Sequence, residues 1–580
     1  MGFEITEALL SNVYMGLHWA DYTVLALYFI SLIIIGINES RKIKSSGDYF
    51  MPRKFGKVMM TFFAFGAGTQ SDQAVSVASK SYTDGLSGIW YQWLYLPVTP
   101  FYWLIAPIMR RFRAITTSDI FELRYDRGVA MLYAIIGTIN LILSLGLMLR
   151  GSGEVLSGCT GGTVSTGWII AVMTIIFLLY GMCGGLAAAV YTDFIQGILI
   201  IIFSFMLLPM LMKEVGGMHG LRASLAGTNL MSLVVPNGIG VFYISAIALN
   251  GLVGVIVHPS MMGNCGAGKT ELEGRVGLVA GNFLKRFCTI AWSLIGVAGV
   301  VYFAGRNIEP DRIFGVTAYE FLPNIMPGLL GIFVGGVLAA VMSTCDALLL
   351  SASALFTENL YRPLNPGKSK MHYVWVGRFT CVPVVVLAIV FAYWLPGVVT
   401  GLEIYWKAGA MMGLAFWLGL FWNRTTVAGA WAATLGTLGM WWLTTQDFFI
   451  DFVADWPGAQ SLGFIIENQG RSEFYLPWQM IFYLVFGLLL GIAVSLFTRP
   501  VDREKLERYY ALIRTPIKPG EAIERNCHIP KDTPVPPRRN IFPGTSLEFM
   551  VPSRQSVSGF LICWLLVFAI VGLFYLIAKM

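Results

Sequence analysis

The chain has 580 residues, of which 56% are hydrophobic and only 13% carry a charge. A soluble domain carries charge on roughly 25% of its residues, so this composition excludes an ordinary soluble protein. The net charge of +7 suits an anionic membrane face and gives no indication of nucleic-acid binding.

Long apolar stretches recur along the whole chain, and each is long enough to cross a bilayer, for which about 20 residues are needed. They predict an all-α membrane protein with about 14 transmembrane helices. The first stretch is interpreted as a membrane helix, since acidic residues precede it and a signal peptide would begin with basic ones. The predicted spans are 22–37, 58–80, 87–109, 129–157, 166–181, 189–212, 238–262, 284–304, 326–356, 373–395, 400–421, 427–444, 475–498 and 557–579.

The basic residues between the spans fall almost entirely in every second loop. Of the 40 Lys and Arg residues, 31 lie in or at the edges of 38–57, 110–127, 263–286, 357–378, 423–424 and 499–556. Basic loops stay in the cytoplasm. We therefore expect a multi-pass protein of the plasma membrane. An even number of spans then leaves both termini extracytoplasmic.

The soluble segments are too short to form a catalytic domain. The largest are an acidic outward segment, 445–474, and a basic, proline-rich inner segment, 499–556, in which 502–510 is typical of a short amphipathic helix. Eight scattered cysteines indicate neither a disulfide framework nor a metal site. No nucleophilic or redox constellation is evident, so we expect no enzyme and no organic cofactor.

The second predicted span contains a run from Gly66 to Gln73 that has no large apolar side chain. It includes Asp72, which is costly inside a bilayer. Such a run is typical of an unwound hinge whose freed carbonyls bind a cation, as in transporters with discontinuous helices. A small-residue face for helix packing is the alternative.

The seventh predicted span is interrupted as well, by Asn250 to Gly254 and then by His258-Pro259-Ser260. Proline removes a backbone donor from a helix. The two broken helices lie five spans apart, which fits a core of two five-helix inverted repeats. The domains so predicted are 1–57 (outward N-terminus, first helix and basic inner loop), 58–212 and 238–421 (the repeats), 427–498 (two accessory helices), 499–556 (cytoplasmic loop) and 557–580 (C-terminal transmembrane helix).

The ninth predicted span places two hydroxyls and a carboxylate within one helical turn, at Ser343, Thr344 and Asp346. Oxygen ligands of this kind suit a small hard cation. Hydrogen bonding of the hydroxyls to the preceding turn is the alternative. In the sixth span, Asp193 is a further candidate, or else a helix cap at the inner surface.

At these residues the chain resembles the sodium/solute symporter family, which includes sodium–glucose cotransporters, proline permease and sialic acid symporters. The resemblance runs from about residue 20 to 515 and is carried by Gly184 to Asp193, Ala339 to Thr357 and the inner loop from Thr116 to Tyr125. A last span after a long inner loop is similar to the sodium–glucose branch. The resemblance implies a sodium-coupled symporter that imports a small polar organic solute by alternating access.

Carried over residue by residue, the resemblance implies two possible sodium sites. The shared site would use backbone oxygens of Gly66, Thr69 and Ala340 and the hydroxyls of Ser343 and Thr344. A second site, found in some members, would use Asp193, Ser343 and Asp346. Ala347 lacks the hydroxyl that the sialic acid symporters have there, so the number of sodium ions per cycle stays open.

The sugar site of the family carries over poorly. Tyr95 stands for a serine, Gly251 for an asparagine, Gly254 for the gating tyrosine and Leu402 for a glutamine. Since each lost hydrogen bond costs about 1 kcal/mol, we expect a solute other than a hexose. Arg150 either binds a solute carboxylate or extends to the outer headgroups. The candidate solute-binding residues are Gln73, Gln92, Tyr95, Arg150, Asn250, His258 and Lys285.

One motif is typical of a different function, nucleotide binding. Gly263 to Thr270 fits the phosphate-binding pattern G-x-x-x-x-G-K-T. That pattern requires a preceding strand, and here a membrane helix precedes it, so we expect no nucleotide and no ATP-driven pump. The remaining alternative to a symporter is a sensor or channel-like protein of the same fold. The expected partners are sodium, the solute and the bilayer, and an unidentified membrane partner is left open.

Overall fold

The computed structural model describes residues 13–41, 50–51, 53–236, 238–468, 470–518, 521, 525–531 and 533–579, with the side chains of 36, 39, 40, 176–185, 460, 468 and 471 also left out. The N-terminal tail and most of the first basic loop, 42–49, therefore lie outside the described residues. Gly184 and Gly185, at the start of the motif that runs from Gly184 to Asp193, belong to the stretch 176–185. Within the described part the fold is helical, with two short antiparallel hairpins.

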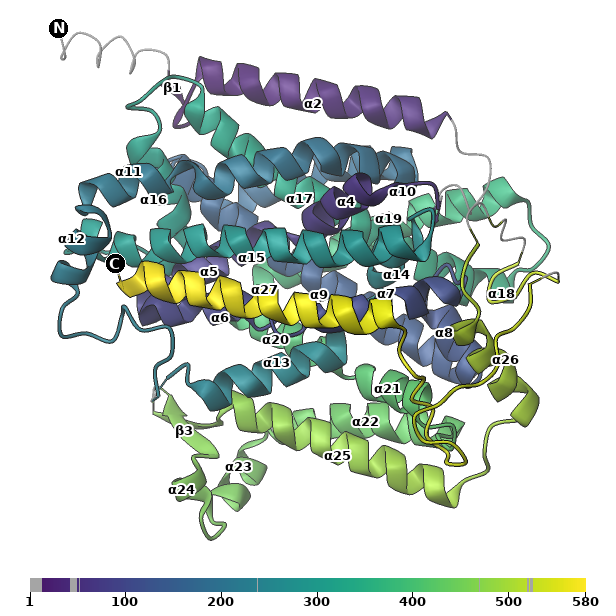
Figure 1. The fold of residues 1–580 in the computed structure, drawn as a ribbon. Helices are drawn as coiled ribbons and strands as arrows, with labels where there is room; N and C mark the ends of the chain where they lie inside the picture. Colours follow the sequence, from purple (N-terminus) through teal and green to yellow (C-terminus); the bar gives the residue numbers. More distant parts are fainter. Residues whose placement is uncertain are drawn as a thin grey trace, which may run out of the picture.

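The helices lie side by side along a common direction (Figure 1). In chain order they are α2 (Trp19–Ser40), α4 (Lys57–Gly68), α5 (Ser71–Asp84), η1 (Gly85–Ile89), α6 (Trp90–Trp93), α7 (Thr99–Arg111), α8 (Thr117–Arg124), α9 (Arg127–Cys159), α10 (Thr166–Met206), α11 (Leu208–Glu214), α12 (Gly217–Ser224), α13 (Val241–Val255), α14 (Met261–Gly266), α15 (Glu271–Tyr302), η2 (Pro310–Arg312), α16 (Ile313–Phe321), α17 (Leu329–Ala354), η3 (Leu355–Tyr361), α18 (Arg362–Leu364), α19 (Lys370–Trp394), α20 (Val398–Ala410), α21 (Gly413–Phe421), α22 (Val427–Leu443), α23 (Asp447–Ala454), α24 (Ala459–Leu462), α25 (Leu476–Phe497), α26 (Arg503–Arg514) and α27 (Arg554–Lys579). The strands are β1 (Val13–Tyr14), β2 (Leu17–His18), β3 (Ile465–Asn468) and β4 (Arg471–Phe474).

Eight of the described helical segments are long and apolar enough to cross a membrane, and four more are shorter and apolar. The protein is therefore a multi-pass membrane protein. Two of the shorter helices, α4 and α13, are the first halves of the predicted broken spans. The spans predicted at 166–181 and 189–212 fall within α10 and α11, and both spans and the residues between them lie in one helical stretch from Thr166 to Met206 followed by α11.

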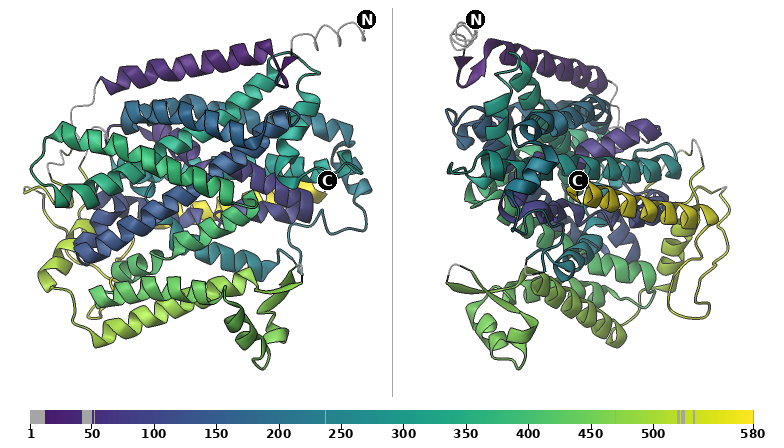
Figure 2. Two further views of the ribbon diagram at one scale, coloured as in Figure 1. Left: turned by 180° about the vertical axis from the view of Figure 1, so that it is seen from behind. Right: turned by 60° about the vertical axis from the view of Figure 1, so that its left-hand side comes forward.

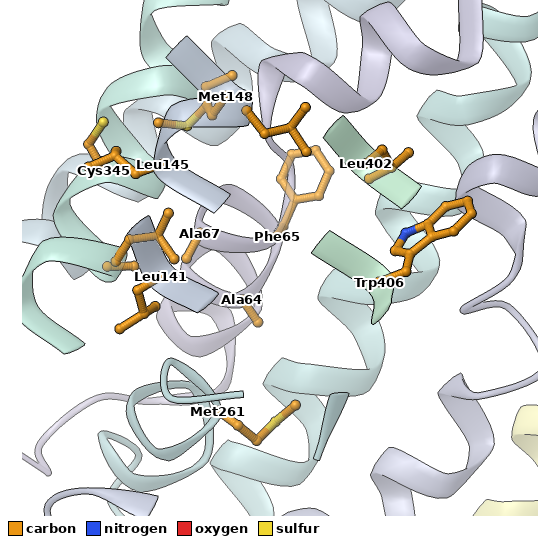
Figure 3. Packing of buried hydrophobic residues seen from close by; sticks show 14 of the residues in the cluster. Ala64, Phe65, Ala67, Leu141, Leu145, Met148, Met261, Cys345, Leu402 and Trp406 are labelled. Atoms are coloured by element: carbon orange, nitrogen blue, oxygen red, sulfur yellow. The ribbon is translucent and has the colours of Figure 1, made fainter. Parts of the chain in front are cut away.

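The core elements pack in a way that brings distant parts of the sequence together. Helix α15 packs on α4, α5 and α7, while α10 packs on α17 and α2, and α9 packs on α19. Figure 3 shows part of this core, with labelled side chains from three helices: Ala64, Phe65 and Ala67 of α4, Leu141, Leu145 and Met148 of α9, and Cys345 of α17. All of these side chains are buried. Helix α4 itself packs on α15, α10 and α17.

Outside this core, α22 pairs with α25, and α27 lies along α7 (Figures 1 and 2). The start of α2 and the end of α27 lie at one end of the bundle, whereas α8, α14 and α26 lie at the other (Figure 1). Arg222 of α12 donates a hydrogen bond to the carbonyl of Lys579 and so holds the end of α27. The described basic loops thus share one face, opposite to the start of α2 and the end of α27.

The two polar segments fold onto the ends of the bundle. Segment 445–474 forms α23, α24 and the β3–β4 hairpin, in which Ile466 pairs with Glu473. The helix predicted at 502–510 is confirmed as α26. After it, Glu521 forms a buried 2.6 Å ion pair with Arg113. The segment after α26 is therefore held by an ion pair to the loop between α7 and α8.

Candidate ion and solute site

The predicted hinge in the second span is confirmed. Helix α4 ends at Gly68 and α5 begins at Ser71. Between them Thr69 has φ −108° and ψ 85°, and Gln70 has φ −81° and ψ 150°, so neither continues the helix. Thr69 is only 1% exposed. Non-helical backbone at this depth is tolerated only where it is enclosed by protein or lines a cavity, and it leaves carbonyls without helical donors.

The break predicted in the seventh span is confirmed as well. Helix α13 ends at Val255 and α14 begins at Met261, with Pro259 between them. Tyr133 of α9 donates a hydrogen bond to the freed carbonyl of Val257. The side chain of His258 is bonded to Ser260, with 2.7 Å between Nδ1 and Oγ.

Three helices converge beside the first hinge. A Cβ atom added to Gly66 of α4 would lie 2.6 Å from the Ser343 hydroxyl of α17 and 3.4 Å from the Asp193 carboxyl carbon of α10. The structure thus brings together Gly66, Asp193 and Ser343, which are far apart in the sequence. Thr344 and Asp346 belong to the same buried stretch of α17.

The oxygen atoms of this cluster are buried. Thr69 Oγ1, Thr344 Oγ1 and Asp346 Oδ1 have no hydrogen-bond partner among the described residues. The Ser343 hydroxyl and the Asp193 carboxylate interact with each other, but neither makes a hydrogen bond of regular geometry to the described part of the chain. Leaving a buried polar group unpaired costs about 1–3 kcal/mol, and more for a charged group. A set of acceptor oxygens of this kind is therefore suited to hold a cation.

The purely structural roles considered for these residues do not match the geometry. The hydroxyls of Ser343 and Thr344 are not bonded to the preceding turn, because neither makes a hydrogen bond of regular geometry in the described part of the chain. Asp193 is not a surface cap, because it lies inside α10 and its exposed fraction is 0%. We see no group of three His, Cys, Asp or Glu side chains suited to a transition metal among the residues that the structure describes.

Tyr28 completes the surroundings of the cluster and was not predicted from the sequence. It comes from α2, outside the predicted repeats, and its hydroxyl accepts a 3.1 Å hydrogen bond from Gln196 Nε2. The Tyr28 hydroxyl interacts electrostatically with Asp193 and Asp346. No motif marks this tyrosine, and only the packing of α2 on α10 and α17 places it here.

A second polar cluster lies on the other side of the hinge. Lys285 of α15 donates a hydrogen bond to the carbonyl of Gly68 and interacts electrostatically with Asp72. Both carboxylate oxygens of Asp72, the side-chain Oε1 of Gln73 and both side-chain amide atoms of Gln92 are buried without a described partner. The cost of Asp72 inside the membrane was evident from the sequence, but its place beside the solute candidates was not.

The remaining solute candidates differ in how many of their polar groups already have partners within the protein. Tyr95 lies under the Arg286 guanidinium, 5.6 Å from the ring centre. Asn250 has both ends occupied, since Nδ2 donates to the carbonyl of Trp406 at 3.0 Å and Oδ1 accepts from the Tyr483 hydroxyl at 2.5 Å. Its amide therefore joins α13 to α20 and α25.

Arg150 belongs to an ionic cluster. It lies 3.2 Å from Glu154, and Glu154 also pairs with Arg312 at 2.8 Å. The Glu154 side chain is only 2% exposed. The adjacent Gly151 lies against the backbone of Asp72, because a Cβ atom there would be 2.6 Å from the Asp72 Cα.

The segment that fits the phosphate-binding pattern joins two helices, α14 and α15. Its backbone pairs with Phe55 through hydrogen bonds at Ala267 and Lys269. Thr270 caps α15 together with Glu273. The element before it is a helix, where a phosphate-binding loop requires a strand.

Comparisons with known proteins agree with this arrangement. Residues 49–436 match the sodium:solute symporter family. The chain is 25% identical over 472 residues to the sodium/glucose cotransporter of Vibrio parahaemolyticus, covering 73% of this chain and 84% of that one. It is 26% identical over 443 residues to the osmoregulated proline transporter OpuE of Bacillus subtilis, covering 73% and 88%.

Among solved structures, the chain is similar to a substrate-bound, outward-open Na⁺-coupled sialic acid symporter. The TM-score is 0.67 at 18% identity, and the match covers 83% of this chain and 99% of the other. The nucleobase-cation-symport-1 transporter Mhp1 matches with a TM-score of 0.51 at 14% identity, covering 80% and 97%. At these identities the two structures support the fold.

Proposed function

The chain belongs to the sodium:solute symporter family, and we propose that it uses a sodium gradient to import a small polar organic solute by alternating access. The observation that carries this proposal is the set of buried, unpartnered oxygens where α4, α10 and α17 meet. A sodium ion would supply the missing partner, so the buried oxygens would be stabilised only while the ion is bound.

The proposed first sodium site uses the carbonyls of Gly66, Thr69 and Ala340 with the hydroxyls of Ser343 and Thr344. It is supported by the broken backbone after Gly68 and by the close approach of Gly66 to Ser343. Unwound carbonyls coordinate sodium in transporters with discontinuous helices. Because the site joins two helices, a bound ion would hold α4 against α17.

The proposed second sodium site uses Asp193, Ser343 and Asp346. Two buried carboxylates that interact with each other are expensive unless a cation lies with them. Tyr28 is a neutral group that contacts this region from α2. A second ion here would double the charge that accompanies each solute.

We place the solute beside the same hinge, against Gln73, Gln92 and Lys285, with Asp72 added to the candidates predicted from the sequence. Tyr95, Arg150, Asn250 and His258 complete the proposed set. The side-chain oxygen of Gln73 is a free acceptor, and the amide of Gln92 offers both a donor and an acceptor. They suit a small solute with hydroxyl, amide or charged groups.

A hexose bound as in the sugar cotransporters is disfavoured by packing. A Cβ atom on Gly254 would lie 2.8 Å from the backbone of Gly409, and one on Gly251 would lie 2.7 Å from Leu94. Larger side chains at these positions would displace α20 or the segment after α6. The room that an asparagine and a gating tyrosine need is therefore occupied.

Sodium and solute would be coupled because their sites share one hinge. Thr69 belongs to the ion cluster, while Asp72 and Gln73 follow it in the first turn of α5. An ion that fixes the carbonyl of Thr69 also fixes the direction in which α5 leaves the hinge. The solute groups would then be presented in one orientation only when sodium is bound.

We also propose that the basic-loop face is cytoplasmic and that the protein lies in the plasma membrane with both termini outside. The support is the charge of the alternate loops. The start of α2 and the end of α27 lie at the opposite face of the bundle (Figure 1).

The test is solute uptake by the purified protein in vesicles. A panel of polar metabolites is screened for thermal stabilisation with and without sodium, and each one that stabilises is tested for uptake. We expect uptake with sodium and none with potassium at constant pH.

Thr344→Ala should raise the sodium concentration for half-maximal uptake about tenfold, because it removes a ligand whose loss costs about 1.4 kcal/mol or more. Thr344→Ser keeps the hydroxyl and should have only a small effect.

Equal uptake in sodium-free buffer would contradict the proposal. Sodium-dependent stabilisation by a solute that is never transported would favour the sensor alternative, and uncoupled sodium flux would favour the channel-like one. Should Thr344→Ala leave the sodium dependence unchanged, the hydroxyls belong to helix packing.

A further inference from the structure

A cavity of about 820 Å³ opens between α7, α13, α21, α25 and the inner segment after α26. Its size is that of a small-molecule pocket. One part is lined by apolar side chains, among them Leu104, Trp417 and Leu488. A second cavity of about 390 Å³ shares Trp417 and Leu488 with it and has an apolar lining throughout. Together they form a long apolar space beside the proposed transport core.

The other part of the cavity is lined by charged residues of the basic-loop face. They are Arg111, Arg275, Arg514, Arg539 and Glu548. Two of these already have partners, since Arg111 is paired with Glu271 at 2.9 Å and Glu548 with Arg538 at 2.6 Å. The charge left over on the wall is therefore positive.

Two of the remaining arginines have unmet hydrogen-bonding capacity. The Nε atoms of Arg275 and Arg514 are buried and have no partner among the described residues. Arg275 is only 7% exposed and is held in place by Trp103, 4.8 Å from its ring centre, and by a 3.2 Å hydrogen bond to the Ser556 hydroxyl. A fixed guanidinium with a free N–H is suited to bind phosphate.

A neutral donor lies in the apolar part. The indole N–H of Trp417 is buried without a described partner and lines both cavities. A ligand that fits the whole space thus has an anionic end, an acceptor near the middle and a long apolar end. Basic pockets between transmembrane helices at the cytoplasmic side bind anionic lipid headgroups.

We propose that this cavity is a binding site for one anionic phospholipid of the leaflet at the basic-loop face. Arg275 and Arg514 bind the phosphate, with Arg539 at the rim. Trp417 donates to an ester carbonyl, and an acyl chain lies against Leu104 and Leu488. The lipid fills the gap between the core and the segment 536–556, which closes the cavity.

The experiment uses the full-length protein, purified in detergent and stripped of lipid. Native mass spectrometry and thermal unfolding measure binding of dioleoyl phosphatidylglycerol, of phosphatidylcholine with the same chains, and of inorganic phosphate. The variants are Arg275→Gln/Arg514→Gln, which keeps size and removes charge, and Leu488→Trp, which fills the apolar part. Arg503→Gln on α26 is the matched control, because that side chain is 92% exposed and lines neither cavity.

We expect phosphatidylglycerol to bind at least tenfold more tightly than phosphatidylcholine and to raise the unfolding temperature. Each cavity variant should lower that affinity about tenfold, and the control should not. Equal binding of both lipids would overturn the proposal, as would a stabilisation by phosphate alone equal to that by the lipid. If the double arginine variant does not fold, Leu488→Trp decides, and unchanged lipid affinity in it overturns the site.

Discussion

At the scale of single residues, the candidate ion site depends on a glycine. The Ser343 hydroxyl and the Asp193 carboxyl lie in the space that a side chain on Gly66 would occupy. The unpartnered oxygens around it are acceptors drawn from three helices. Such an arrangement is stable only with a cation or with protons on the carboxylates, so its residues should be sensitive to small changes.

Gly66→Ala should abolish sodium-dependent stabilisation and uptake. The added methyl group would lie 2.6 Å from Ser343 Oγ, which forces that hydroxyl out of the site. Gly68→Ala is the matched control, because a Cβ atom there has nothing within 4 Å. Both residues lie in α4, and alanine has a higher helix propensity than glycine. Sodium titration by thermal unfolding checks the pair, and equal sodium responses would contradict the role of Gly66.

Asp346→Asn should decide whether one sodium ion or two are carried. If two ions bind, the wild-type protein shows a Hill coefficient for sodium above one. The variant removes a charged ligand of the second site and should lower the coefficient toward one and the charge-to-solute ratio toward that of a single ion. Uptake with simultaneous charge measurement checks this. Identical values for both proteins would make Asp346 a structural residue and the stoichiometry one.

At the scale of helices, both breaks could be predicted, because proline, glycine and polar residues interrupt an apolar span and mark where its helix is discontinuous. Composition also predicted which hydroxyls of α17 are buried in the core. What could not be predicted is which of the polar side chains already have hydrogen-bond or ion-pair partners inside the protein. Both ends of the Asn250 amide are bonded to Trp406 and Tyr483, whereas Arg150 is paired with Glu154 and keeps a buried Nε without a described partner. Only the packing of helices distant in sequence determines this.

Glu521→Gln should destabilise the protein by about 3–5 kcal/mol, because it leaves the buried Arg113 guanidinium without its carboxylate. The two side chains are 5% and 0% exposed and 2.6 Å apart. Glu507→Gln is the control, since its pair with Arg503 has side chains 68% and 92% exposed and contributes about 0–1 kcal/mol. Unfolding temperatures compare the two, and equal shifts would contradict the structural role of the Arg113–Glu521 pair.

At the scale of the whole molecule, the alternation of basic loops predicted two unlike faces, and the described loops do gather at one end of the bundle (Figure 2). The charge pattern could not predict how those loops hold one another. Arg124, for example, is 1% exposed and donates to the carbonyls of Gly419, Trp422 and Thr425, which lie about 300 residues further along. Because every residue has a backbone carbonyl, such partners cannot be recognised from the residue types.

Uptake of a neutral solute should be electrogenic. Each sodium ion that enters moves one positive charge inward, and a potential of 100 mV adds about 2.3 kcal/mol per charge. An inside-negative potential imposed on vesicles with a potassium diffusion gradient should therefore accelerate uptake, and a collapsed potential should slow it. Rates that do not respond to voltage would indicate that another ion compensates the charge.

The Arg113–Glu521 pair also has a consequence for how the protein is made. Its two members lie 408 residues apart, and the carbonyl of Ile513 that accepts from Arg111 lies 402 residues away. At a synthesis rate of ~5–20 residues per second, an emerging Arg113 waits roughly 20–80 s for its counter-charge. During that time the Arg113 guanidinium lacks this partner, although the residues of the proposed ion site, all of which precede Glu521 in the chain, have already been synthesised. A chain truncated before Glu521 would therefore leave that guanidinium without its carboxylate.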